Sequence, residues 1–237
     1  MARTAIWKTI TATLTHDIAT GKYAPGDRLP TEAQLAARFG VNRHTVRRAI
    51  SDMNESGLTY SRRGAGVFVA QRPTDYPIGK RVRFHQNLAA AGRVPAKEIL
   101  TLETRAASAH EAEQLGLEGE ALVHVYEGLS LADDQPIAIF RSLFPAARFP
   151  DLLKALETSR SVTSALAQGG VADYTRASTR LTAKLANATQ ALHLRLTEGA
   201  PILRSAGINV DPEGVPVEYG VTWFAGDRVT LTLNPGD

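Results

Sequence analysis

Basic side chains in one stretch of the sequence have the spacing of a helix that binds DNA. At roughly 3.6 residues per turn, a helix over residues 43–56 would have one apolar side and one cationic side. The cationic side would carry Arg43, His44, Arg47, Arg48 and Ser51. Neither Arg43 nor Arg47 has an acidic residue four positions away, although a solvated helix face is the ordinary interpretation of such a cluster. Arginine in the major groove can bridge O6 and N7 of guanine, so the pattern favours a recognition helix.

A glycine-rich tip follows, with arginines before it and a short alternating strand after it. Arg62 and Arg63 precede Gly64 and Gly66, and residues 67–69 alternate as a strand does. A dinucleotide-binding loop would need a strand before it, a helix after it and a third glycine, and these conditions are not met. We therefore expect a two-stranded wing whose arginines follow phosphates or enter a minor groove.

Arginines in the second part of the sequence could hold an anion. Arg141, Arg176 and Arg180 fall in expected strands, and Arg83 stands where this part of the chain begins. Strict alternation would place Arg176 and Arg180 on one face, and a cleft lined by these guanidinium groups could bind a dianion. Taken singly, each arginine is better explained by a surface ion pair with a neighbouring carboxylate.

Other polar and aromatic residues complete the candidate effector site. Ser161 and Thr163 stand at the start of an expected helix, where backbone amides could donate to an anion, or where the two residues could simply act as caps. Glu218 could bind an amine, although an exposed strand glutamate is the more ordinary interpretation. The expected lining also includes Phe84, His85 and Tyr174.

Three helices must position the cationic residues. Apolar residues recur at spacings of three and four over residues 4–20. A capping box that starts at Thr31 precedes a helix at 33–39, and Asn42 can cap a helix at 43–56. A short helix, a tight turn and a longer helix form a helix-turn-helix, and together with the wing they predict a winged helix-turn-helix domain.

The remaining sequence has the changing periodicity of an α+β domain. Pro73 and Pro77 favour a linker over residues 73–80, which would separate a domain of residues 1–72 from one of residues 81–237. Strands are expected at 98–105, 121–131, 136–144, 174–182, 202–210, 215–224 and 229–233, and helices at 82–91, 109–115, 150–156, 162–168 and 183–192. Two similar hairpins suggest a sheet of two halves with a cleft between them.

Charge is divided unevenly along the chain. Residues 1–72 carry 11 Lys and Arg against 5 Asp and Glu, whereas the rest carries 16 against 19. A basic domain on a mildly acidic one suggests a nucleic-acid-binding part attached to a part with another role. Charge alone would equally allow a chance distribution.

Several classes of protein do not fit the composition. Cysteine is absent, so disulfides, thiolate nucleophiles and cysteine-ligated zinc are excluded. No apolar run approaches the roughly 20 residues of a membrane helix, and we expect a cytoplasmic protein without a membrane partner. The sequence has no GxSxG, P-loop or HExxH motif and no histidine pair at metal-ligand spacing. We therefore expect no catalytic residues, no cofactor and no metal.

Nearly all of residues 5–70 resembles the winged-helix domain of the GntR family of bacterial transcription regulators. The matching runs are Pro25-Gly26-Asp27-Arg28-Leu29-Pro30-Thr31-Glu32, Phe39-Gly40-Val41-Asn42-Arg43-His44-Thr45-Val46-Arg47-Arg48-Ala49-Ile50 and Gly64-Ala65-Gly66-Val67-Phe68-Val69. The resemblance implies DNA contacts from Arg28, Arg43, His44, Thr45, Arg47 and Gly66. The full expected set adds Thr31, Arg48, Arg62, Arg63 and Gly64.

From about residue 81 to residue 233 the chain resembles the UTRA effector domain of the HutC branch of that family. The runs Arg81-Val82-Arg83-Phe84-His85-Gln86-Asn87-Leu88 and Tyr174-Thr175-Arg176-Ala177-Ser178-Thr179-Arg180 are most similar to regulators of phosphonate metabolism. The resemblance implies a mixed α/β fold like that of chorismate lyase, with a mainly antiparallel sheet. It also implies a phosphonate or phosphate-bearing effector, and it matches Ser161 and Thr163 to a phosphate-binding helix start and Glu218 to an acidic pocket position.

These observations lead to one main hypothesis and three alternatives. We expect a homodimeric repressor of phosphonate uptake or metabolism genes, which binds an inverted repeat in double-stranded operator DNA and a small anionic effector. The alternatives are a regulator of the same branch that senses an unrelated metabolite, a chorismate-lyase-like enzyme with a DNA-binding domain, and an architectural DNA-binding protein. Turnover of chorismate would favour the enzyme, and equal affinity for random and palindromic DNA would favour the architectural protein.

Overall fold

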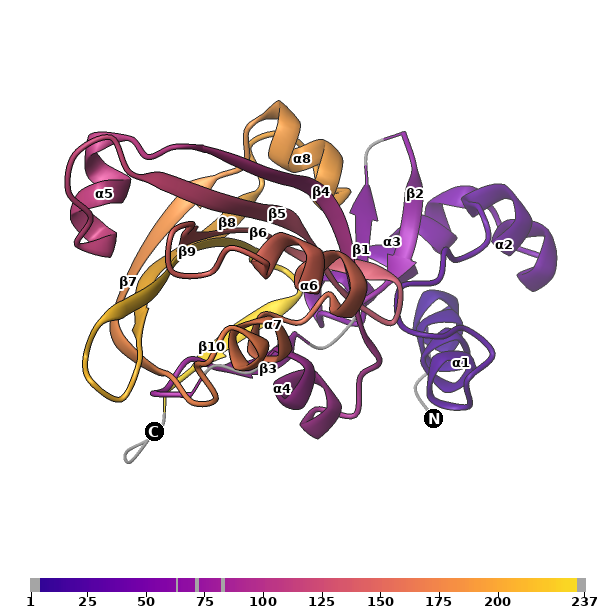
Figure 1. The fold of residues 1–237 in the computed structure, drawn as a ribbon. Helices are drawn as coiled ribbons and strands as arrows, with labels where there is room; N and C mark the ends of the chain where they lie inside the picture. The colour runs from indigo at the N-terminus through magenta and orange to yellow at the C-terminus, as the bar shows by residue number, and fades with distance from the viewer. Residues whose placement is uncertain (1–4, 63, 71–72, 82–83, 234–237) are drawn as a thin grey trace. The chain divides into compact units, whose positions relative to one another are not determined.

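The computed structural model describes residues 5–62, 64–70, 73–81 and 84–233 (Figure 1). Contacts divide the chain into two units, Met1–Arg72 and Pro73–Asp237, which we call the N-terminal and C-terminal units. Each unit has its own buried core.

The N-terminal unit consists of three helices and a two-stranded antiparallel sheet. Its elements are α1 (Ile6–Ala19), α2 (Glu32–Phe39), α3 (Arg43–Glu55), β1 (Thr59–Arg62) and β2 (Gly66–Val69). Thr31 begins α2 with the expected capping box, and the Asn42 side chain accepts a hydrogen bond from the first turn of α3. Leu14, Leu35 and Met53, one from each helix, are fully buried together. The predicted winged helix-turn-helix is confirmed.

The C-terminal unit is built on a six-stranded antiparallel sheet with the strand order β4-β5-β6-β9-β8-β7. The strands are β4 (Pro95–Ala106), β5 (Leu122–Ala132), β6 (Gln135–Pro145), β7 (Thr175–Leu185), β8 (Pro201–Val210) and β9 (Pro216–Ala225). One half of the sheet is β4–β6 and the other is β7–β9, and the halves join where β6 pairs with β9. The predicted α+β class with a mainly antiparallel sheet is confirmed.

Helices cover both faces of this sheet (Figure 1). The inner face, as we name it, packs against α6 (Leu152–Ser159) and α7 (Val162–Gln168) through a core around Tyr126 and Phe144. The small parallel pair β3 (Thr74–Pro77) and β10 (Val229–Thr232) and helix α4 (Phe84–Ala90) pack against the same face. The outer face carries α5 (Ala109–Leu115) and α8 (Ala188–Leu194).

Two local expectations need correction. Residues 73–80 are not an irregular linker, because they contain β3. This strand has only four residues, with Pro73 before it and Pro77 at its end, so neither proline interrupts its pairing with β10. The helix expected at 183–192 begins later, because β7 continues to Leu185 and the capping box of Asn187 then starts α8.

Candidate functional site

Helix α3 exposes the basic residues of its expected cationic side. The exposed residues are Arg43, His44, Arg47 and Arg48, whereas Val46, Ala49, Ile50 and Met53 are buried. The Asn42 side chain accepts hydrogen bonds from the backbone amide and the hydroxyl of Thr45, at 2.9 and 3.0 Å. This cap holds the first turn of α3 while its basic side chains remain accessible.

Arg47 has an acidic partner that the spacing within α3 does not reveal. Its Nε and Nη2 atoms donate to Oε1 and Oε2 of Glu32, at 3.0 and 2.8 Å. These hydrogen bonds lower the pKa of Glu32. Because Glu32 is the first residue of α2, the pair joins the two helices of the helix-turn-helix and holds the guanidinium in a defined orientation.

The other predicted DNA contacts lie around this helix and in the wing. The Arg48 guanidinium lies 4.8 Å from the centre of the Trp7 ring. The Thr31 hydroxyl donates to Gln34 Oε1 at 2.9 Å within the cap of α2. Arg62 ends β1, Gly64 follows in the turn, and Arg63 lies outside the described residues.

Gly66 makes room for Arg28 at the base of the wing. A Cβ atom on Gly66 would lie 2.7 Å from Arg28 Nε, and Gly66 has a φ of +113°, which favours glycine. The position of Arg28, a predicted DNA contact, therefore requires that Gly66, another predicted contact, has no side chain.

We expect Gly66→Ala to destabilise the N-terminal unit by about 1–3 kcal/mol, because alanine is strained at this φ. It should also weaken operator binding by displacing Arg28. Gly57→Ala is the control, because Gly57 also has a positive φ, of +71°, but has open space around it. Thermal unfolding and fluorescence anisotropy with operator DNA measure both effects. Equal operator affinity in the two variants would contradict the proposed role of Gly66.

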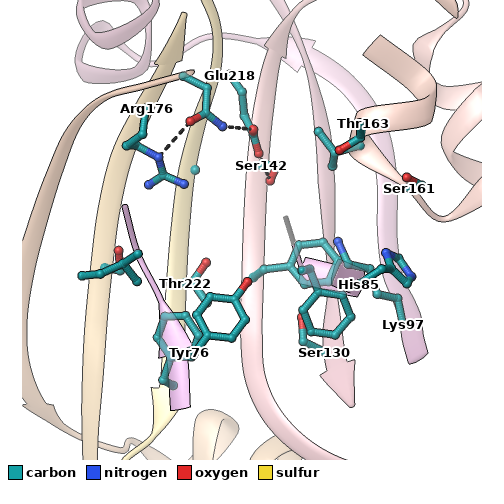
Figure 2. Close-up of a pocket in the computed structure, with 18 of the residues that line it drawn as sticks. Tyr76, His85, Lys97, Ser130, Ser142, Ser161, Thr163, Arg176, Glu218 and Thr222 are labelled. Carbon is teal, nitrogen blue, oxygen red and sulfur yellow. Dashed lines mark hydrogen bonds between the residues drawn. The ribbon is translucent and has the colours of Figure 1, made fainter. Parts of the chain in front are cut away.

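A cavity of about 120 Å³ lies on the inner face of the sheet in the C-terminal unit. Seven of the residues expected to bind an effector line it, namely Phe84, His85, Ser161, Thr163, Tyr174, Arg176 and Glu218. Figure 2 shows Arg176 and Glu218 on one side, and Ser161, Thr163, His85 and Lys97 on the other.

Arg176, Asn209 and Glu218 form a row across three neighbouring strands, β7, β8 and β9. Arg176 Nε donates to Asn209 Oδ1 at 2.8 Å, and Asn209 Nδ2 donates to Glu218 Oε2 at 2.6 Å. The Ser142 hydroxyl donates to Glu218 Oε1, also at 2.6 Å. Asn209 therefore stands between the guanidinium and the buried carboxylate and keeps them from pairing directly.

Lys97 is a cation of the cavity that the sequence analysis missed. Its ammonium group lies 4.3 Å from the centre of the Phe140 ring and 5.3 Å from the centres of the Phe84 and Tyr126 rings. Burial lowers the pKa of Lys97 to about 8, against the opposing effect of Glu218. No local pattern marks this residue, because a lysine in an edge strand ordinarily extends into solvent.

The hydroxyl groups at the other side of the cavity have partners within the protein. Ser161 caps α7, its side chain accepting a hydrogen bond from the Ser164 amide at 3.3 Å. Thr163 Oγ1 lies 3.0 Å from the Tyr174 hydroxyl. Both residues nevertheless line the cavity, where their hydroxyls could also contact a ligand.

Arg180 does not join Arg176, contrary to the expectation from strict alternation. The register of β7 shifts between Arg176 and Ser178, so a bulge at this point reverses the alternation. Arg180 lies opposite Ala206, whose side chain belongs to an outer-face core. The exposed Arg180 side chain is therefore directed away from the cavity.

Arg141 does not line the cavity either. Arg141 stands between Phe140 and Ser142, which both line the cavity, so alternation directs Arg141 to the outer face. There its Nη2 atom lies 2.8 Å from Glu127 Oε2. Arg83 lies outside the described residues. Of the expected arginines, the described lining therefore contains Arg176, and it also contains Lys97.

The described part of the chain contains no group of three His, Asp or Glu side chains that could hold a metal ion. None of its helices is long and apolar enough to cross a membrane.

Comparisons with known proteins cover both units. The family described as "Bacterial regulatory proteins, gntR family" matches residues 7–69, and the "UTRA domain" matches residues 90–230. The chain is 37% identical over 231 residues to an uncharacterized HTH-type transcriptional regulator of Rhizobium meliloti (strain 1021), which covers 97% of this chain and 94% of the relative.

Two further proteins to which the chain is similar are both named PhnF. The chain is 36% identical over 213 residues to the "Probable transcriptional regulator PhnF" of Escherichia coli (strain K12), covering 89% of this chain and 88% of the relative. The crystal structure of PhnF from Mycobacterium smegmatis has a TM-score of 0.68 and 24% identity, covering 95% of this chain and 98% of that one. At this low identity, the similarity to the Mycobacterium smegmatis structure shows a shared fold only.

Proposed function

Since the chain belongs to the GntR family of bacterial regulatory proteins and carries a UTRA domain, it is a DNA-binding transcriptional regulator, and we propose that it is a repressor responding to a phosphonate or phosphate-bearing molecule. The effector would bind in the cavity of the C-terminal unit and lower the affinity for operator DNA. The controlled genes would serve phosphonate uptake or metabolism, as the resemblance to that group of regulators implies.

The two cationic side chains that line the cavity are our reason for proposing an anionic effector. Lys97 and Arg176 both line it, and no described carboxylate lies within ion-pair distance of either. Removing a charge from water without a partner is costly. A bound dianion would supply that partner, and the hydroxyls of Ser161 and Thr163 could add hydrogen bonds.

The N-terminal unit supports a proposal for how operator DNA is bound. A homodimer would place two α3 helices in successive major grooves, with Arg43, His44 and Arg47 at base edges and the wings along the backbone. The operator would be an inverted repeat with half-site centres about 10 base pairs apart or less. Effector binding would change the mutual placement of the two recognition helices, so that their spacing no longer fits both half-sites.

Thermal unfolding and operator binding of the full-length protein test this function. We expect at least one member of a panel of phosphonates, phosphate esters and inorganic phosphate to raise the melting temperature, because it binds only the folded state. The same compound should release operator DNA in a fluorescence anisotropy titration. A panel without any thermal shift or change in operator affinity would contradict the anionic effector and favour an unrelated metabolite.

A further inference from the structure

The described lining of the cavity carries a negatively charged side chain as well as the two positively charged ones. Glu218 is 8% exposed, and the hydrogen-bond donors on its carboxylate are the neutral groups of Ser142 and Asn209, each at 2.6 Å. Within the described residues no basic side chain lies at ion-pair distance from Glu218, so the carboxylate is buried without a counter-charge.

The sum of these charges distinguishes between kinds of anion. Among the described residues of the lining, Lys97 and Arg176 contribute two positive charges and Glu218 one negative charge, which leaves one net positive charge. A simple dianion would carry one charge too many and would face the Glu218 carboxylate as a like charge. A ligand with a dianionic group and an ammonium group has one net negative charge and gives every charged group in the cavity an opposite partner.

The size of the cavity limits the length of such a ligand. A single water molecule needs roughly 10–15 Å³ of cavity volume. The cavity of about 120 Å³ therefore accommodates about eight to twelve groups of that size. A phosphonate and an amine joined by a chain of two or three carbons fit this volume.

We propose that the effector is a short zwitterion, an aminoalkylphosphonate or an aminoalkyl phosphate, whose ammonium group binds the Glu218 carboxylate. Lys97 and Arg176 balance the dianionic group. The inference rests on the proposed function and narrows the class of effector. Asn209 has a positioning role, because it holds the Glu218 carboxylate apart from the Arg176 guanidinium and leaves both available to the ligand.

Isothermal titration calorimetry with matched ligands tests this proposal on the full-length protein. We expect 2-aminoethylphosphonate to bind at least tenfold more tightly than ethylphosphonate, which lacks the amine. Glu218→Gln keeps the shape of the side chain, removes its charge and replaces one acceptor oxygen by a donor, and it should abolish this preference. Glu127→Gln is the control, because Glu127 pairs with Arg141 on the outer face and its loss should leave the preference intact. O-phosphoethanolamine, compared with 2-aminoethylphosphonate, shows whether the site prefers a phosphate ester or a phosphonate, and ethyl phosphate is its counterpart without the amine.

The possible outcomes separate this inference from the proposed function. Equal affinity of the wild-type protein for 2-aminoethylphosphonate and ethylphosphonate would overturn the zwitterion and leave the anionic effector standing. A preference that persists in a folded Glu218→Gln variant would overturn the role of Glu218. Binding of none of the four compounds would overturn the zwitterion, and the anionic effector would fall as well only if inorganic phosphate and the rest of the panel also failed to bind. The comparison of the two phosphonates on the wild-type protein needs no variant, so it tests the zwitterion even if Glu218→Gln fails to fold.

Discussion

An Arg47→Ala variant is expected to bind its operator about 1–3 kcal/mol more weakly, and to lose its preference at one base pair of each half-site. Arg47 lies on the exposed side of α3, and its guanidinium is oriented by two hydrogen bonds to Glu32. An oriented arginine can make the bidentate contact to guanine that discriminates between bases. The exposed ion pair itself contributes little to stability because solvent screens it, so the melting temperature should hardly change.

Arg62→Ala is the matched comparison, because it removes the same charge from the wing. We expect it to weaken binding to all sequences by a similar factor and to lower the salt dependence of binding, as loss of a phosphate contact does. Anisotropy titrations with the operator, single-base variants and random DNA separate the two effects. Loss of discrimination in Arg62→Ala, with none in Arg47→Ala, would show that the helix and the wing have the opposite roles.

Lys97→Met and Arg176→Ala are each expected to abolish the thermal shift caused by the effector. At an effector concentration of 100 Kd, binding adds about 2.7 kcal/mol to the stability of the folded state. A shift of roughly 2–4 °C per kcal/mol is usual for a domain of this size. Either variant removes one of the two cations that balance the dianionic group, whereas operator binding in the absence of effector should persist.

Arg180→Ala provides the control for these variants. Arg180 and Arg176 are on the same strand, but the bulge between Arg176 and Ser178 directs Arg180 to the outer face. The effector should therefore shift the melting temperature of Arg180→Ala as much as that of the wild type. An equal loss in Arg180→Ala and Arg176→Ala would mean that the anion binds elsewhere.

The affinity for the effector should also depend on pH through Lys97. The protonated amine attracts the anion, and burial lowers the pKa of Lys97 to about 8. A bound anion favours the protonated form, so binding takes up protons and the affinity should fall as the pH rises through about 8. Lys97→Arg, which stays charged, should give a flatter profile in calorimetry between pH 7.5 and 9.5. An unchanged slope in that variant would contradict this role for Lys97.

Local patterns were sufficient to predict the DNA-binding unit. The capping groups of Thr31 and Asn42 act within three residues of the helices that they begin, and the apolar stripe of α3 follows from helix geometry alone. The alternation of the strands in the two similar hairpins, and the turns that join them, likewise indicated the antiparallel sheet. Such signals involve residues close together in the chain, and they can therefore be read before the tertiary contacts are known.

The candidate effector site depended on contacts that no local pattern contains. The bulge in β7 reversed the direction of Arg180, because one extra residue changes the face of every side chain after it. Lys97 and Arg176 come from the two edge strands of the sheet, and they line one cavity only because the folded sheet and its covering helices enclose it. Their partial burial, the spacing role of Asn209 and the pairing of Arg47 with Glu32 are set by strand register and helix packing between distant parts of the chain.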